Sequence, residues 1–180
     1  MKPITPEDHI RGNINAPIKI VEYSDTECPF CKLLHTTLKR IVQENGDKVA
    51  WVYRHSPIDQ LHPNARKEAE ATECAAELGG NDKFWAYIDR LFEVTPGNNG
   101  LDLAELPRIA QYVGLDVAAF NKCLAENKYA EKIEAHKQDA IATGGGGTPW
   151  SIVVGPKGKK EVNGAYPYEL FMGVINDLLK

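Results

Sequence analysis

The feature that most constrains this chain is a Cys-x-x-Cys motif between a predicted strand and a predicted helix. The strand is the apolar, β-branched run 18–23, and Cys28-Pro29-Phe30-Cys31 follows it after a short polar loop. Cys28 is predicted at the helix N-cap and Pro29 at the first helical position, where no backbone N–H is needed. Free amides and the positive helix end favour a Cys28 thiolate, which lowers its pKa from about 8.5 to about 3.5–7.5. Cys31 lies one turn later and can form a disulfide with Cys28, so the motif indicates a redox dithiol.

Composition excludes several classes of function. The chain has 180 residues and 43% hydrophobic content, so one domain, with an insertion, is expected. Its 21 basic and 25 acidic residues give a net charge of −4 without a basic block, which argues against nucleic acid and anionic membranes as partners. No run approaches the about 18 apolar residues that a membrane span needs.

The N-terminus and the cysteines bear on location. The first residues lack the apolar core of a signal peptide, so the protein is either cytosolic or a mature form whose leader was replaced by Met1. Four cysteines form an even set, which suits an oxidising compartment.

Secondary-structure signals divide the chain into two outer parts and an insertion. Residues 1–16 are predicted as a lead-in segment, and strand, helix and strand then form a βαβ unit with parallel strands. From His62 to about Thr143 strand signals are almost absent. The outer elements are strand 18–23, the helix after Cys28 that ends at Asn45-Gly46, strand 49–54, strand 150–154, strand 159–163 and helix 168–179.

Amphipathic patterns predict five helices in the insertion. Gly79-Gly80 separates the first from the second. Asp102 and Glu105 form a predicted capping box for the third, and Pro107 is expected to kink or delay that helix.

Without the insertion, the order is β-α-β followed by β-β-α, which is a thioredoxin-like order. Three segments carry a more specific resemblance: Val21–Cys31, Leu61-His62-Pro63, and Gly147-Thr148-Pro149 before a strand. Together they resemble the DsbA-like thiol–disulfide oxidoreductases, over nearly the whole chain. The resemblance implies an α/β, thioredoxin-like fold with a large helical insertion between the βαβ and ββα halves. Its domains would be 1–61 with 141–180, and an inserted helical domain at 62–140.

The resemblance implies a substrate site around the dithiol. Thr148–Pro149 would be a cis peptide bond facing the cysteines, which is compatible with chemistry because cis bonds are essentially a proline property. The Thr148–Pro149 segment, together with Pro29 and Phe30, would bind an extended substrate chain by strand addition. The alternative is that Pro149 only opens an edge strand.

The resemblance also implies a functional carboxyl group near the dithiol. Glu22 matches the family's buried acid six residues before the first cysteine, and strand alternation places it on the face of Ile18 and Ile20. Either it is buried and takes a proton from Cys31, or it reaches solvent at the strand end.

The remaining cysteines and histidines give weaker predictions. Some DsbA-like proteins carry a non-catalytic disulfide where Cys74 and Cys123 stand; the alternative is two buried free thiols. Among the histidines, His35 is predicted at the surface, and His136 in the core. No role is assigned to His55 and His62, which flank the loop after the second strand.

The predicted reaction is thiol–disulfide exchange with unfolded or reduced protein substrates, without a cofactor beyond the redox-active Cys28–Cys31 disulfide. Cys28 would attack and Cys31 would resolve the mixed disulfide; release of a stabilised Cys28 thiolate makes the protein an oxidant. Phe30 stands where the best-known members have His, so we expect a milder oxidant. A reductase or isomerase is the enzymatic alternative.

The non-enzymatic alternative is a metal-binding dithiol module. It needs four converging ligands, whereas Cys74 and Cys123 lie in the insertion, so no metal is expected. The resemblance also implies a membrane redox partner that resets the dithiol. A monomer in a periplasmic or otherwise extracytoplasmic location is expected, with the cytoplasm as the alternative location.

Overall fold

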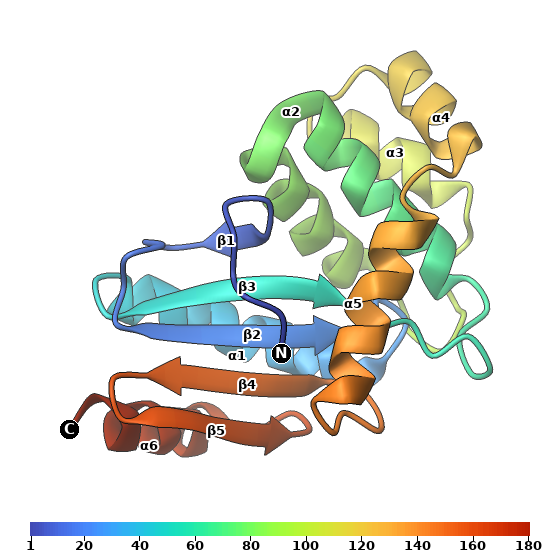
Figure 1. Ribbon diagram of the computed structural model, residues 1–180. Coiled ribbons are helices and arrows are strands. Elements are labelled where there is room, and N and C mark those ends of the chain that lie inside the picture. Colours follow the sequence, from blue (N-terminus) through green and yellow to red (C-terminus); the bar gives the residue numbers. More distant parts are fainter.

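One five-stranded mixed sheet organises the chain in the computed structural model, which describes residues 1–180 (Figure 1). The strand order is β1-β3-β2-β4-β5. As predicted, β2 and β3 are parallel, and every other pair is antiparallel. β2 is therefore the central strand. The loop with the Cys-x-x-Cys motif follows the C-terminal end of β2, midway across the sheet. The strands are β1 (His9–Arg11), β2 (Ile18–Ser24), β3 (Val49–His55), β4 (Trp150–Gly155) and β5 (Gly158–Asn163).

The prediction of residues 1–16 as a lead-in without a strand is wrong. β1 pairs with β3, with His9 opposite Tyr53. Side chains fasten this segment: Arg54 Nε donates to Asp8 Oδ1 at 2.8 Å, and the Lys2 N–H donates to Asp139 Oδ1 at 2.7 Å. A three-residue strand held by such distant partners leaves almost no periodic signal in the sequence.

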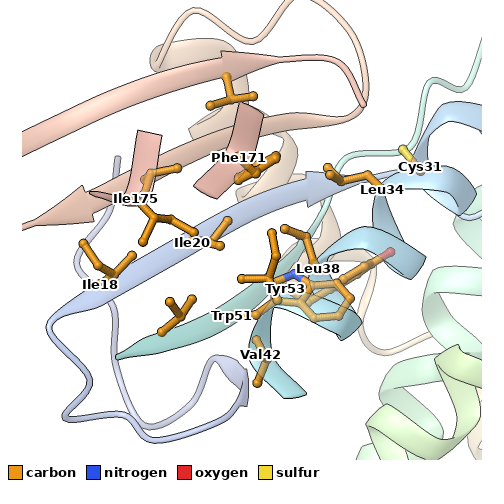
Figure 2. Close-up of a cluster of buried hydrophobic side chains, with 14 of the residues drawn as sticks. Ile18, Ile20, Cys31, Leu34, Leu38, Val42, Trp51, Tyr53, Phe171 and Ile175 are labelled. Atoms are coloured by element: carbon orange, nitrogen blue, oxygen red, sulfur yellow. The ribbon is translucent and has the colours of Figure 1, made fainter. Parts of the chain in front are cut away.

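Helices cover both faces of the sheet. α1 (Pro29–Asn45) and α6 (Tyr168–Leu179) pack on one face, and both begin and end as the sequence predicts. Figure 2 shows the core between them, in which Leu34 and Leu38 of α1 meet Trp51 and Tyr53 of β3. α5 (Ala130–Ala142) covers the opposite face, where Ala140 packs in a smaller apolar cluster with residues of β2, β3 and β4.

The rest of the insertion is a group of helices beside the sheet (Figure 1). It contains α2 (Ala65–Val94), α3 (Glu105–Tyr112) and α4 (Val117–Glu126). α2 is one range with an interruption, because Gly79 and Gly80 leave helical geometry where a break between two helices is predicted. Its second half contributes Phe84, Trp85, Ile88 and Phe92 to the core of the sheet. The insertion therefore shares a core with the sheet, and the boundaries at 62 and 141 stay a prediction.

The predicted capping box of α3 is wrong in detail. The helix begins at Glu105, and the Asp102 carboxylate accepts a hydrogen bond from the Ala104 N–H at 2.9 Å. Pro107 falls in the first turn, where its missing N–H leaves no helical hydrogen bond unmade. The later start is thus the delay expected from Pro107. No helix of the structure combines the length and apolarity needed to cross a bilayer.

Candidate active site

Cys28 occupies the N-cap of α1, with extended backbone geometry at φ −76° and ψ 121°, and Pro29 begins the helix. This is the predicted arrangement. A turn holds the cysteine, because its N–H donates to the Asp25 carbonyl at 3.1 Å and its own carbonyl accepts from the Lys32 N–H at 3.1 Å. Cys28 is 6% exposed and Cys31 is fully buried, so the first sulfur is the more accessible of the two.

The two thiols differ in acidity. A hydrogen bond from the Cys31 thiol is the main cause that lowers the pKa of Cys28 to about 6, and the Phe30 and Cys31 backbone amides lower it further. Burial raises the pKa of Cys31, and charge on Cys28 and Glu22 raises it more. At neutral pH the pair therefore holds its negative charge at Cys28 and its proton at Cys31.

The segment before β4 faces Cys28 from the other side of the site. The Thr148–Pro149 peptide bond is cis, and Cys28 Sγ lies 3.4 Å from the Thr148 carbonyl oxygen. The glycines just before it are open, since a Cβ at Gly146 or Gly147 would meet no atom within 4 Å. A pocket of about 460 Å³ lies beside these glycines, between the loop after β3 and the end of α5.

Two exposed apolar side chains stand on the first turns of α1. Phe30 and Leu33 are each 61% exposed. Phe30 lies inside the motif and places no hydrogen-bonding or charged side-chain group beside Cys28. The surface around the thiol therefore combines open backbone with apolar side chains.

Glu22 is fully buried on β2, so the alternative in which it reaches solvent is wrong. Trp51 Nε1 donates to its Oε2 at 2.9 Å. Burial raises the pKa of Glu22 to about 7, Ser24 and Trp51 oppose that rise, and Cys28 adds to it. This carboxyl group is thus able to exchange a proton near neutral pH.

Two further acids at the active-site loop are not predicted from the sequence. Glu27 and Glu68 are both fully buried. Burial raises the pKa of Glu68 to about 9, and the neighbouring Glu27 carboxyl is the next cause. A signal for Glu68 exists, because it lies between Ala65 and Ala69 on the apolar side of a predicted helix.

The histidines differ from their predictions. His35 is not at the surface: it is 4% exposed, and its Nε2 lies 2.7 Å from Asp89 Oδ1. The sequence does not predict the burial of His35, because the groups around it come from distant elements. α2 supplies Asp89, and the rings of Trp51 and Phe92 pack against the imidazole. His136 is half-buried rather than a core residue, and its Nδ1 accepts from the His55 N–H at 3.3 Å.

His62 and Asp25 connect the loop after β3 to the active-site loop. His62 Nδ1 lies 2.9 Å from Asp25 Oδ2, and the Ile58 N–H donates to the same oxygen at 2.7 Å. His55 instead contacts Glu73, away from the dithiol. Of the two histidines that flank this loop, only His62 is tied to the segment that carries Cys28.

Cys74 and Cys123 form a disulfide between α2 and α4, with 5.8 Å between their Cα atoms. The alternative of two free thiols is therefore wrong. Because these cysteines are bonded to each other, they do not supply the further ligands that a metal-binding dithiol module needs.

Comparisons with known proteins agree with this fold. A sequence model of the thioredoxin family matches residues 4–177, so the chain belongs to that family. The crystal structure of Pseudomonas aeruginosa DsbA2 superimposes with a TM-score of 0.81 and 31% identity, covering 98% of this chain and 97% of that one. Wolbachia pipientis alpha-DsbA1 gives 0.80 and 26%, covering 97% and 92%. Within the family the chain is DsbA-like.

The curated relatives are larger proteins. The Na⁺/H⁺ antiporter NhaA 3 of Salinispora tropica is 35% identical over 156 residues, which is 86% of this chain and 23% of the antiporter. The chain spans about a quarter of the length of the antiporters it matches.

Proposed function

We propose that this protein is a thiol–disulfide oxidoreductase that introduces disulfide bonds into protein substrates. The observation that carries the proposal is the asymmetry of the dithiol: the pKa of Cys28 is lowered to about 6, and burial raises that of Cys31. A thiolate of low pKa is a good leaving group, so its release drives transfer of the disulfide to the substrate.

The reaction takes two displacements. A substrate thiolate attacks the Cys28 sulfur of the Cys28–Cys31 disulfide; a mixed disulfide forms, and Cys31 leaves and is protonated. A second substrate thiolate then attacks the substrate sulfur of the mixed disulfide, which releases Cys28 as a thiolate. The substrate loses two electrons to the Cys28–Cys31 pair, and no cofactor takes part. Run in reverse, the same steps make Cys28 the nucleophile and Cys31 the resolving thiol.

Glu22 is proposed to exchange the proton of Cys31 in these steps. It is buried, and the charges of Glu22 and Cys31 act on each other. With its pKa raised to about 7, it can give a proton when Cys31 leaves and accept one when Cys31 attacks.

The substrate is proposed to be an extended polypeptide paired with the backbone of Thr148. The Thr148 carbonyl lies beside Cys28 Sγ, and the open glycines before it leave room for a second strand. Pro149, Pro29 and the exposed Phe30 would border the bound chain. The exposed, apolar Phe30 ring suits unfolded or reduced protein rather than a folded surface.

We also propose an extracytoplasmic location and a membrane redox partner that reoxidises the dithiol. The Cys74–Cys123 disulfide supports an oxidising compartment, because structural disulfides are rare in reducing cytosol. The protein is proposed to act as a monomer, with its dithiol accessible to both substrate and partner.

Equilibration with glutathione tests the direction of the reaction. We expect a potential between about −180 and −120 mV, as for oxidants, with oxidative refolding of a reduced substrate faster than reduction of insulin. Cys28→Ser should abolish both activities. A potential near about −270 mV with efficient insulin reduction would instead establish a reductase.

A further inference from the structure

Four buried oxygen atoms without a hydrogen-bond partner belong to one face of the sheet. They are Glu22 Oε1, Ser24 Oγ, Tyr53 Oη and Ser151 Oγ. Each of these residues is at most 1% exposed. Buried polar groups are almost always paired, so four unpaired oxygens in one place call for a functional explanation.

Sheet register brings these side chains together around Glu22. Tyr53 of β3 and Ser151 of β4 are its direct partners on either side. Ser24 lies two residues further along β2 and so shares the face. Neighbouring strands are only about 4.8 Å apart, which places three hydroxyl groups around one carboxyl group. We call Ser24, Tyr53 and Ser151 the hydroxyl set.

Cys31 lies above this face. Figure 2 shows it at the start of α1, over the face that carries Trp51 and Tyr53. Burial raises the pKa of Tyr53, charge on Glu22 and on Cys31 raises it further, and the Ser24 hydroxyl lowers it. The same hydroxyl lowers the pKa of Glu22. Ser24 therefore lies beside both groups.

The groups that face Glu22 are neutral donors or potential anions. Trp51 and Tyr53 come from β3, Ser24 from β2, Ser151 from β4, and the thiols Cys28 and Cys31 from α1. Asp25, at the end of β2, also acts on Tyr53. No cation is among them. When Glu22 loses its proton, hydrogen bonds from neutral donors must stabilise the charge, and Trp51 makes one at 2.9 Å.

We infer that the hydroxyl set consists of positioning residues for the proton transfer between Cys31 and Glu22. Hydroxyl groups both donate and accept, so the set accepts from the neutral carboxyl and donates to the carboxylate. In the resolving step the Cys31 S–H bond breaks, its proton passes to Glu22, and the Cys31 sulfur displaces the thiolate bound to Cys28. Ser24 and Tyr53 stabilise the Glu22 carboxylate that awaits this proton, and so set the pH at which the step proceeds. This inference rests on the proposed role of Glu22.

The resolving step can be measured alone. Treating the reduced protein with an aromatic disulfide such as Ellman's reagent gives a mixed disulfide at Cys28 and releases one equivalent of coloured thiolate. Attack by Cys31 then releases a second equivalent, and this second phase, which Cys31→Ala lacks, reports the resolving step. We expect Ser24→Ala and Tyr53→Phe each to move the pH midpoint of this release upward by about one unit, because the Glu22 carboxylate loses a donor. Tyr87→Phe is the matched control: Tyr87 is a buried tyrosine whose hydroxyl donates to the Leu106 carbonyl in the insertion. It should keep the wild-type midpoint.

A direct titration separates this inference from the proposed function. Infrared difference spectra of the Glu22 carboxyl, assigned by its loss in Glu22→Gln, report its protonation without any turnover. If Glu22→Gln leaves the release profile unchanged, the role of Glu22 itself fails. If Glu22→Gln alters the profile while Glu22 titrates at the wild-type pH in both Ser24→Ala and Tyr53→Phe, the hydroxyl set is overturned and the proposed function stands. Circular dichroism checks folding, and either variant alone suffices should the other fail to fold.

Discussion

Glu27, the residue before Cys28, and Glu68 of α2 are neighbouring, fully buried carboxyl groups. Two carboxylates in such contact cannot both be charged without a large cost, and the raised pKa of Glu68 places the shared proton there. The pair also joins two parts of the fold, since Glu27 precedes Cys28 in the active-site loop and Glu68 belongs to α2.

The backbone of Glu27 adds a second connection to the insertion. Its carbonyl accepts from the Asn98 N–H at 2.7 Å, and its carboxylate accepts from the Asn99 N–H. Both asparagines, with Gly97 before them, have left-handed backbone geometry. Gly97 also packs on the Cys28 turn, because a Cβ there would lie 3.2 Å from the Glu27 carbonyl oxygen. The active-site loop is thus tied to the insertion by the Asn98 and Asn99 backbone donors and lies next to the buried Glu68 carboxyl group.

Stability should fall with rising pH because of Glu68. Its pKa is about 9 when folded and near 4.5 when unfolded, so folding takes up a proton between these values. The stabilisation is complete below about pH 4.5 and is lost as pH rises through about 9. Glu68→Gln should remove this dependence, which amounts to at most about 1.4 kcal/mol per pH unit. Urea unfolding at several pH values checks it, with exposed Glu131→Gln as control. Parallel profiles for wild type and Glu68→Gln would contradict a shared proton.

The Cys28 thiolate should titrate near pH 6 in the reduced protein. The hydrogen bond from Cys31 is the main cause, so Cys31→Ala should raise the midpoint by about one unit or more, whereas Cys31→Ser, which keeps a donor, should raise it less. Ultraviolet absorbance of the thiolate measures both, and Cys28→Ser provides the blank. Identical midpoints in the two Cys31 variants would show that the helix amides alone set the acidity of Cys28.

Local sequence signals are enough to predict the part of this fold that carries the dithiol. The apolar run before Cys28, the proline after it and Asn45-Gly46 fix the strand, the start of α1 and its end, because each acts on its own neighbours in the chain. For the same reason the parallel pairing of β2 and β3 follows from one βαβ unit.

The features that the sequence did not reveal depend on distant partners. β1 is held by contacts with β3 and with Asp139, and His35 is buried because Asp89 of α2 reaches it. Glu27 is a loop residue whose burial requires α2 and the Pro96–Gly100 loop to close over it. Periodicity indicates the face of an element, but it does not indicate which polar group of another element will meet that face.

Phe30 should limit the oxidising strength of the protein. Because Phe30 is 61% exposed, Phe30→His should fold normally, and it would add a hydrogen-bonding and partly charged ring beside the Cys28 thiolate. We expect the equilibrium with glutathione to shift about tenfold toward the reduced enzyme, with a lower Cys28 midpoint. Leu33→His is the control, because Leu33 is equally exposed on the same helix but lies outside the motif. An equal shift in both variants would indicate a general charge effect rather than a contact with the thiolate.

The Cys74–Cys123 disulfide should stabilise the fold without tuning the dithiol. It joins α2 to α4 across 49 residues, so cross-linking the unfolded chain is worth about 4 kcal/mol in the chain-entropy model. A Cys74→Ala, Cys123→Ala double variant should have a free energy of unfolding in urea that is lower by about 4 kcal/mol, while its equilibrium with glutathione stays at the wild-type value. The equilibrium constant with glutathione is expected to stay unchanged because Cys74 and Cys123 belong to the core of the insertion. Cys28 and Cys31 belong instead to the core of the sheet. A changed redox equilibrium in this variant would mean that the insertion transmits strain to the active-site loop, for which the Glu27–Glu68 contact is the available route.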